Sequence, residues 1–290
     1  MTLSNSTSPA DHFIGARLEI LRGEIMILVN DLPLFEPNET IGGNDHEALN
    51  FNFNGVLMPG RNEFTLKTRL APPEDTGQSP HIRIEFAYWQ GGQFGGRIGE
   101  HPSAISLSIS LDNMGRVVMQ QENRGQPMML AEPAIHLAGP LREDEWNEFS
   151  IRIKLGHALP QPAWTSGQIL RDNAATRTAI KEQFSRAHIA IKSGRQDYEE
   201  FILPQLILQG TAYGLHPRQY ADNLIGAMFN PRLGLQLQPY DDTKSQLRLF
   251  GHGRLATLVP TPIRLESAVS SGAPFLYFWK DQAGNWQVLH

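Results

Sequence analysis

Residue patterns that support nucleophilic or metal-assisted chemistry are scarce in this chain. The chain contains no cysteine, which removes thiolate catalysis and disulfide bonds. It has neither a Gly-x-Ser-x-Gly nucleophile motif nor a convincing Ser-x-x-Lys motif. Its ten histidines include no His-x-x-x-His pair and no His-Glu-x-x-His zinc motif. We therefore predict that the protein is not an enzyme and that it uses no cofactor and no bound metal.

The densest group of potential metal ligands is Asp45-His46-Glu47. Neighbouring residues of a strand or loop point in different directions, so three in a row rarely close on one ion. The polar segment from Glu36 to His46, which contains Gly42-Gly43, has the composition of a loop. A solvated acidic loop is therefore the interpretation that we favour over a metal site.

Two glycine-rich segments resemble nucleotide-binding loops by their letters alone. Gly91 to Gly96 lacks the Lys-Ser/Thr of a P-loop, and no clear helix follows to hold a phosphate at its N-terminus. It indicates either a plain connection between strands or a binding loop, in which Tyr88, Trp89 and Phe94 would supply aromatic contact area. Gly251-His252-Gly253 lies between two β-rich stretches and predicts a hairpin turn.

Acidic residues form two groups that would suit a basic protein partner. One is the cluster from Glu143 to Glu148, which also fits a wet surface with no binding role. The other is the segment from Glu36 to Glu47. Charge complementarity speeds association and helps to select the partner. Together with the aromatic residues, these groups make up the predicted partner-binding residues: Glu36, Glu39, Asp45, Glu47, Tyr88, Trp89, Phe94, Glu143, Asp144, Glu145 and Glu148.

In the first half of the chain, residues 1–155, strands must position these groups. Leu49, Phe51 and Phe53 alternate with asparagines, which predicts a half-buried strand. Alternation or a short apolar run also predicts strands at residues 17–29, 63–70, 81–89, 105–111, 116–121 and 148–155. Eight or so strands with turns between them favour an all-β sandwich domain.

The second half of the chain predicts a different architecture. Residues 156–168 contain two prolines and little periodicity, which is typical of a linker. An α+β domain is expected over residues 169–290. Its first helix would be capped by Thr165 or Ser166 and run to about Lys192, with Ile169 on its apolar stripe. Further helices are expected at about 197–212 and 217–228, and strands at 233–237, 246–250, 254–259, 263–266, 274–280 and 286–289.

Charge and hydropathy limit the class of partner. Residues 1–155 contain 12 Lys and Arg against 20 Asp and Glu, a net charge of -8, and the remainder carries +3. An acidic first half argues against nucleic acid, whose phosphates require a basic face. No apolar stretch approaches the ~18 residues of a membrane helix, and the N-terminus lacks the features of a signal peptide. We therefore expect a soluble, cytoplasmic protein with a protein partner, without contacts to nucleic acid or membrane.

Two segments resemble parts of known folds. The closing segment PFLYFWKDQAGNWQVL, from Pro274 to Leu289, resembles the final hairpin of NTF2-like and cystatin-like domains. LVNDLPL followed by LMPGRNEFTL, between Leu28 and Leu66, resembles the strand rhythm of jelly-roll and immunoglobulin-like sandwiches. Neither resemblance brings catalytic residues. The combination of an acidic, cysteine-free chain with such folds resembles bacterial immunity proteins against toxins of type VI secretion.

That resemblance implies a non-enzymatic inhibitor that neutralises a cognate toxin by occlusion. Two alternatives remain open. The first is a carbohydrate- or ligand-binding module, for which Trp89 and Phe94 would be exposed contact residues. The second is an NTF2-like enzyme that uses the C-terminal cone, with His216 and Tyr240-Asp241-Asp242 at its mouth. The aromatic residues Tyr277, Phe278, Trp279 and Trp286 are expected to pack the sheet instead of binding a cofactor.

Overall fold

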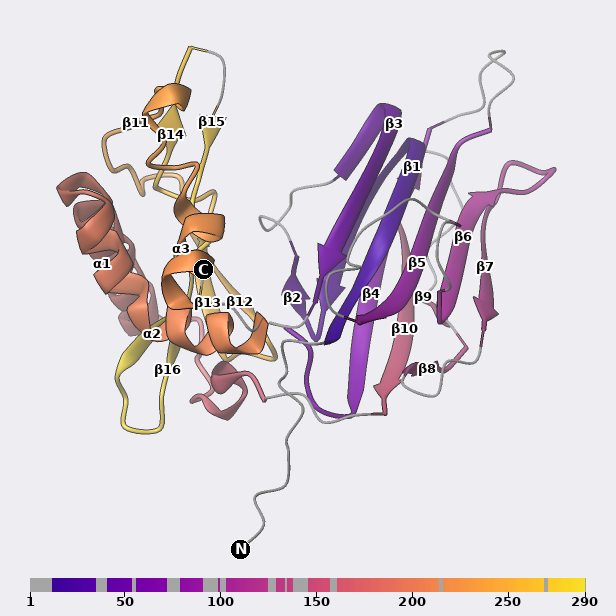
Figure 1. The fold of residues 1–290 in the computed structure, drawn as a ribbon, viewed down its shortest axis with the longest axis horizontal. Coiled ribbons are helices and arrows are strands. Elements are labelled where there is room, and N and C mark those ends of the chain that lie inside the picture. The colour runs from indigo at the N-terminus through magenta and orange to yellow at the C-terminus, as the bar shows by residue number, and fades with distance from the viewer. Residues whose placement is uncertain are drawn as a thin grey trace, which may run out of the picture. The chain divides into compact units, whose positions relative to one another are not determined.

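The computed structural model describes residues 12–34, 41–53, 56–71, 79–90, 99, 103–124, 129–133, 135–137, 146–156, 161–213, 216–268 and 271–289. The chain divides into two compact units, Met1–Gln161 and Pro162–His290 (Figure 1). The first unit is built from strands, and the second has helices followed by short antiparallel strands. The structure thus confirms a mostly β protein with a large antiparallel sheet and few helices.

A ten-stranded sheet forms the first unit. Its strands are β1 (His12–Val29), β2 (Leu32–Pro33), β3 (Ile41–Asn52), β4 (Arg61–Leu70), β5 (His81–Gln90), β6 (Ile105–Leu111), β7 (Val117–Asn123), β8 (Met129–Ala131), β9 (Ile135–Leu137) and β10 (Asn147–Leu155). They follow the order β7-β6-β5-β1-β4-β10-β8, with β2 and β3 also paired to β1 and β9 paired to β10. The longer strands were predicted from the sequence, whereas β2, β8 and β9 were not.

A bend in β1 folds the sheet over itself. β5 pairs with residues 12–21 of β1 and β4 pairs with residues 23–29, on either side of Arg22, whose φ is 52°. Phe86 of β5 lies opposite Ala16. Phe64 of β4 lies opposite Val29, about 43 Å further along a straight strand at ~3.3 Å per residue. The centroids of the two phenylalanine rings are nevertheless 5.0 Å apart. The two halves of the sheet therefore face each other across a shared core.

That core is built by the alternation of buried and exposed side chains. In β4, for example, Phe64, Leu66, Thr68 and Leu70 are buried while the residues between them are more exposed. Phe53 packs against both Phe64 and Phe86, with ring centroids 5.3 and 6.1 Å away. Complete burial of each such side chain stabilises the fold by about 1.5–3 kcal/mol. Apolar residues from both halves of the sheet thus hold the two layers together.

β3 begins inside a segment whose composition predicts a loop. The prediction covers residues 36–46; residues 36–40 lie outside the described residues, and residues 41–46 belong to β3, so for these the prediction was wrong. The reason is steric. Gly42 has a φ of 105°, and a Cβ there would lie 2.1 Å from the carbonyl oxygen of Gly23 on β1. Here glycine lets two backbones approach each other within a sheet instead of ending a strand.

Three helices open the second unit. They are α1 (Ala174–Ser193), α2 (Arg195–Tyr213), which contains Pro204, and α3 (Pro217–Ile225). The side chain of Asn173 caps α1 by accepting a hydrogen bond of 2.9 Å from the N–H of Thr176. The predicted caps, Thr165 and Ser166, instead end a short 3-10 helix, η2 (Ala163–Ser166).

The start of α1 was misplaced because tertiary contacts hold the preceding segment in an extended form. The N–H of Gln168 donates to the carbonyl oxygen of Lys280, and that of Leu170 to Gly253. Ile169, expected on the apolar stripe of the helix, is 66% exposed. Propensity alone does not distinguish Ser or Thr from Asn as an N-cap, so these long-range bonds decide the helix start.

Short antiparallel strands complete the second unit. One sheet has the order β12-β13-β16-β17 and the other β11-β14-β15. Their bounds are β11 (Gln236–Leu237), β12 (Gln246–Phe250), β13 (Leu255–Val259), β14 (Leu265–Glu266), β15 (Ser271–Gly272), β16 (Tyr277–Lys280) and β17 (Trp286–Leu289), and η3 (Pro231–Leu233) precedes β11. The hairpin turn at Gly251-His252-Gly253 is confirmed. Tyr277, Phe278 and Trp279 are buried, which confirms their packing role.

Candidate functional site

One face of the layer formed by β3, β1, β5, β6 and β7 points away from the core and is polar. The strand registers place Arg17 of β1 between Asn50 of β3 and Glu85 of β5. Ser106 of β6 and Glu122 of β7 continue the same line. Residues directly opposite each other in antiparallel strands share a face of the sheet. These polar side chains therefore form one row across the layer.

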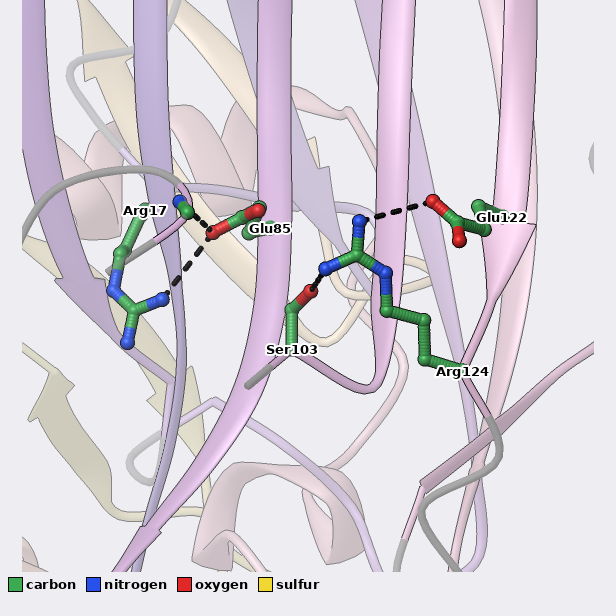
Figure 2. Close-up of polar contacts among 6 residues, drawn as sticks. Arg17, Glu85, Ser103, Glu122 and Arg124 are labelled. Atoms are coloured by element: carbon green, nitrogen blue, oxygen red, sulfur yellow. Dashed lines mark hydrogen bonds and ion pairs between the residues drawn. The ribbon is translucent and has the colours of Figure 1, made fainter. Parts of the chain in front are cut away.

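Two members of this row are buried. Arg17 is 1% exposed and Glu85 is 3% exposed, and Nη1 of the arginine lies 3.2 Å from Oε2 of the carboxylate. A dashed line marks this contact in Figure 2. The backbone N–H of Gly99 donates to the same Oε2 atom at 3.0 Å. Charges are buried in proteins only when they are paired and hydrogen-bonded. This pair therefore ties β1 to β5 on the outer face of the layer.

Arg124, just beyond β7, continues the polar contacts on this face. It donates hydrogen bonds to Oγ of Ser103 at 3.1 Å and to Oε2 of Glu122 at 2.9 Å (Figure 2). The bond between the two charged groups raises the pKa of Arg124 and lowers the pKa of Glu122. Both groups are therefore charged at neutral pH and act as fixed charges, not as a general acid and base.

β3 is an edge strand of this layer. Within the described part of the chain, β1 is the only strand that pairs with β3. The N–H of Phe53 donates to the carbonyl oxygen of Ile14 on β1 at 2.8 Å. Because backbone groups alternate in direction along an antiparallel strand, Leu49 also turns its backbone groups towards β1. By the same alternation, Ala48 and Asn50 turn their N–H and C=O groups towards the open edge.

The side chains of β3 show that the core is open at this edge. Leu49 pairs with the buried Leu18 of β1 and so lies on the core side of the layer, yet it is 37% exposed. Phe51 is partly buried, and its ring centroid lies 6.5 Å from that of Phe53 in the core. An apolar surface therefore extends from the centre of the core to the edge strand.

Carboxylates flank this apolar edge. Glu47 pairs with Ile20 of β1, which places its side chain on the core side beside Leu49, and it is partly buried. On the outer face, Glu19 contacts His46 at 3.2 Å and Arg83 at 3.8 Å. The residues from Ile41 to Asn52 include no Lys or Arg. The strand thus combines open backbone groups, an apolar strip and negative charge.

The predicted partner-binding residues other than Glu47 and Glu148 fall into three groups. Asp45 and Trp89 are described by their backbone alone, in β3 and β5. Tyr88 is partly buried against the core, which raises the pKa of its hydroxyl group. Six of the predicted residues lie outside the described residues: Glu36, Glu39, Phe94, Glu143, Asp144 and Glu145.

The structure does not bring Glu148 together with Glu47. Glu148 lies on β10 opposite Lys67 of β4, and the two charged groups are 3.3 Å apart. Its neighbour Phe149 points into the core, so Glu148 faces away from it on the other layer of the sheet. Of the predicted acidic residues within the described ranges, those on β3 are therefore the ones that lie at the open edge.

Sequence reasoning missed the features that distinguish β3. The open backbone groups of Ala48 and Asn50 depend on which strands pair, and this does not follow from a local pattern. The buried pair had a signal: Arg17 stands between Ala16 and Leu18, and Glu85 is likewise flanked by apolar residues. A charged residue within an otherwise apolar strand indicates a partner on a neighbouring strand.

In the second unit, the residues proposed for the mouth of a cone have structural partners. His216 caps α3 by accepting a hydrogen bond from the N–H of Arg218. The hydroxyl of Tyr240 donates to the carbonyl oxygen of Lys181 on α1 at 3.1 Å, and burial, then Asp242, raise its pKa. Asp241 accepts hydrogen bonds from the following turn. These side chains connect elements of the fold.

A groove with a volume of about 580 Å³ lies between α2 and α3. At one end Arg195 binds Glu199 and Asp222, so its charge is already compensated. The residues that line the groove are Arg195, Gln196, Glu199, Glu200, Leu203, Leu206, Pro217, Arg218 and Ala221. His216 and Asp241 are not among them.

The described residues were also compared with what a metal site and a membrane-spanning helix require. Among the described residues, no three His, Asp or Glu side chains gather as a metal site would require. None of the helices in the described ranges combines the length and apolar character that crossing a membrane demands. No protein-family model, no curated protein and no solved structure matches this chain. A functional proposal for the chain thus depends on the geometry around β3.

Proposed function

We propose that this chain is a non-enzymatic protein-binding inhibitor that contacts its partner through β3. The observation that supports the proposal is an edge strand of 12 residues whose backbone groups and apolar side chains remain partly open to solvent. Edge strands invite pairing with other chains, and proteins normally protect them with Lys, Pro, bulges or a covering segment. β3 contains neither Lys nor Pro, and the irregularity in its pairing with β1 lies between Gly43 and His46, before Ala48 and Asn50.

Negative charge favours a basic protein as the partner. Glu47 lies on the core side of the sheet at this edge, and residues 1–155 carry a net charge of -8. Complementary charge raises the rate of association and discriminates between partners. In its most specific form, the proposal is an immunity protein that occludes the active site of a toxin of type VI secretion.

Site-specific photo-crosslinking in the native cells tests this function. A photoreactive phenylalanine analogue replaces Ala48 on β3 or, as a control, Met114. Met114 is 75% exposed on the turn between β6 and β7, at the opposite end of the layer. We expect one protein to be cross-linked in stoichiometric amounts from position 48 and not from position 114. The purified partner should then lose its activity when one equivalent of this chain is added.

The absence of any product from position 48, or the same products from both positions, would contradict the proposal. A cross-linked partner whose activity does not change would retain the binding function and remove the inhibitory one. The photoreactive side chain suits position 48, because Ala48 is exposed and its side chain points to the outer face.

A further inference from the structure

We infer that the partner binds by adding a strand to β3, and that this strand carries a basic residue followed or preceded by two apolar residues at alternate positions. The inference rests on the proposed function and specifies the chemistry of the partner. In strand addition, main-chain hydrogen bonds supply affinity and alternate side chains supply specificity. β3 presents both kinds of contact.

The hydrogen bonds come from the residues that turn away from β1. Ala48 and Asn50 direct their N–H and C=O groups to the open edge, and His46 belongs to the same alternation. All three residues are exposed. An extended segment can therefore pair with β3 without displacing a hydrogen bond that the described residues make.

The side-chain pattern follows from the residues between them. Glu47, Leu49 and Phe51 share the core side of the layer, because they lie opposite buried residues of β1. Cross-strand partners of an added strand would occupy the same side. A Lys or Arg fits opposite Glu47, and apolar residues fit opposite Leu49 and Phe51, where they would cover the open end of the core.

A second copy of β3 is a poor occupant for the same reason. Antiparallel self-pairing centred on Ala48 would place Glu47 of one copy opposite Leu49 of the other. Self-pairing centred on Leu49 would place Glu47 opposite Phe51. Either register buries a carboxylate against an apolar side chain without a counter-charge, which is costly. The glutamate thus disfavours self-association while favouring a basic partner.

Synthetic peptides provide the probe. Two fluorescent hexapeptides, Lys-Thr-Val-Thr-Val-Thr and the reversed Thr-Val-Thr-Val-Thr-Lys, represent the parallel and antiparallel orientations. Copies of the antiparallel peptide with N-methylated threonines, and copies of the parallel peptide with N-methylated valines, cannot donate backbone hydrogen bonds to β3, because opposite residues bond directly in antiparallel pairs and their neighbours bond in parallel pairs. Copies with Glu in place of Lys reverse the charge. We expect the full-length chain to bind one orientation in fluorescence anisotropy, and either change to weaken binding at least tenfold.

Protein variants test the same contact from the other side. Ala48→Pro removes an N–H that faces the open edge, a position where an edge strand tolerates proline. Ala48→Thr keeps the N–H and serves as its control. We expect Ala48→Pro to abolish peptide binding and Ala48→Thr to retain it, while both keep the circular dichroism and melting temperature of the parent. Glu47→Lys should transfer the preference to the Glu-containing peptide.

The outcomes separate strand addition from the proposed function. If neither orientation binds, or if N-methylated peptides bind as well as the others, strand addition is wrong even when position 48 cross-links a protein in cells.

Amide hydrogen exchange gives a second readout that needs no variant. Bound peptide should slow exchange at Ala48 and Asn50 and leave Leu49 unchanged, and protection of Leu49 alone would overturn the inference. Peptide binding without any cellular partner would contradict the proposed function only.

Discussion

The buried ion pair between Arg17 and Glu85 predicts a large and strongly non-additive effect on stability. The two groups are 1% and 3% exposed and lie 3.2 Å apart. At an effective dielectric constant of ~20, their attraction is about 5 kcal/mol. The desolvation of each ion opposes this attraction by several kcal/mol, so the net contribution of the intact pair is small.

Removal of one partner leaves the other charge buried without the counter-charge of this pair. We therefore expect Arg17→Met and Glu85→Leu each to lower the free energy of unfolding by about 3–5 kcal/mol. The double variant removes both charges and replaces them with apolar side chains of similar size. It also removes the acceptor of the Gly99 N–H, and because Gly99 is exposed to water this loss costs about 0.5–1.5 kcal/mol. The double variant should thus be more stable than either single variant.

Urea unfolding of the full-length parent and the three variants, followed by circular dichroism, measures this double-mutant cycle. The expected coupling energy is at least about 3 kcal/mol, because two separate losses of this size are replaced by one smaller loss. Single variants that lose under 1 kcal/mol, or a double variant whose loss equals the sum of the single losses, would refute the reasoning. The surface pair of Lys67 and Glu148 is the matched control and should show a coupling of about 0–1 kcal/mol.

Three further predictions concern the backbone and pH. Gly42→Ala should lower the free energy of unfolding by about 1–3 kcal/mol, because the φ of Gly42 is 105° and the new Cβ would meet the carbonyl oxygen of Gly23. Gly272 has open space around it, so Gly272→Ala should leave stability unchanged in the same urea titration. Asn173→Ala should destabilise α1 by about 1 kcal/mol in that assay, and Asn173→Ser should restore most of it. Hydrogen bonds from Arg116 lower the pKa of Asp112, so the stability that this turn contributes is present above pH ~4 and is lost as the pH falls through the lowered value. Melting temperatures of the parent and of Asp112→Asn should therefore converge in acid, and a constant difference down to pH 2 would contradict this assignment.

Much of the secondary structure could be predicted from the sequence because its causes are local. The alternation Ile105, Leu107 and Ile109 predicts β6, and the structure has this strand at residues 105–111. Proline at the first turn predicts the start of α3 at Pro217. Gly251-His252-Gly253 between two β-rich stretches predicts the hairpin between β12 and β13, and in the structure both glycines have a positive φ. In each case the residues within the element itself determine its local conformation.

The errors arose where distant segments decide the local structure. Gly42 predicts a loop by composition, but the close approach of Gly23 makes it part of a strand. Thr165 and Ser166 predict a helix cap, but bonds to Lys280 and Gly253 keep the following residues extended. The candidate site shows the same limit: among the predicted acidic residues that the structure describes, those on β3 lie on an edge strand and Glu148 does not, which the sequence pattern does not reveal.

The sequence by itself determined the acidic first half, the strands of that half and the order of helices and strands in the second, since these depend on residue type and short-range periodicity. Only the tertiary structure decided that Arg17 and Glu85 form a buried pair. It also decided that β1 bends and that β3 has a partner on one side alone within the described residues. These features depend on which strands pair. Strand pairing is set by the burial of side chains from residues far apart in the chain, and a local pattern does not contain that information.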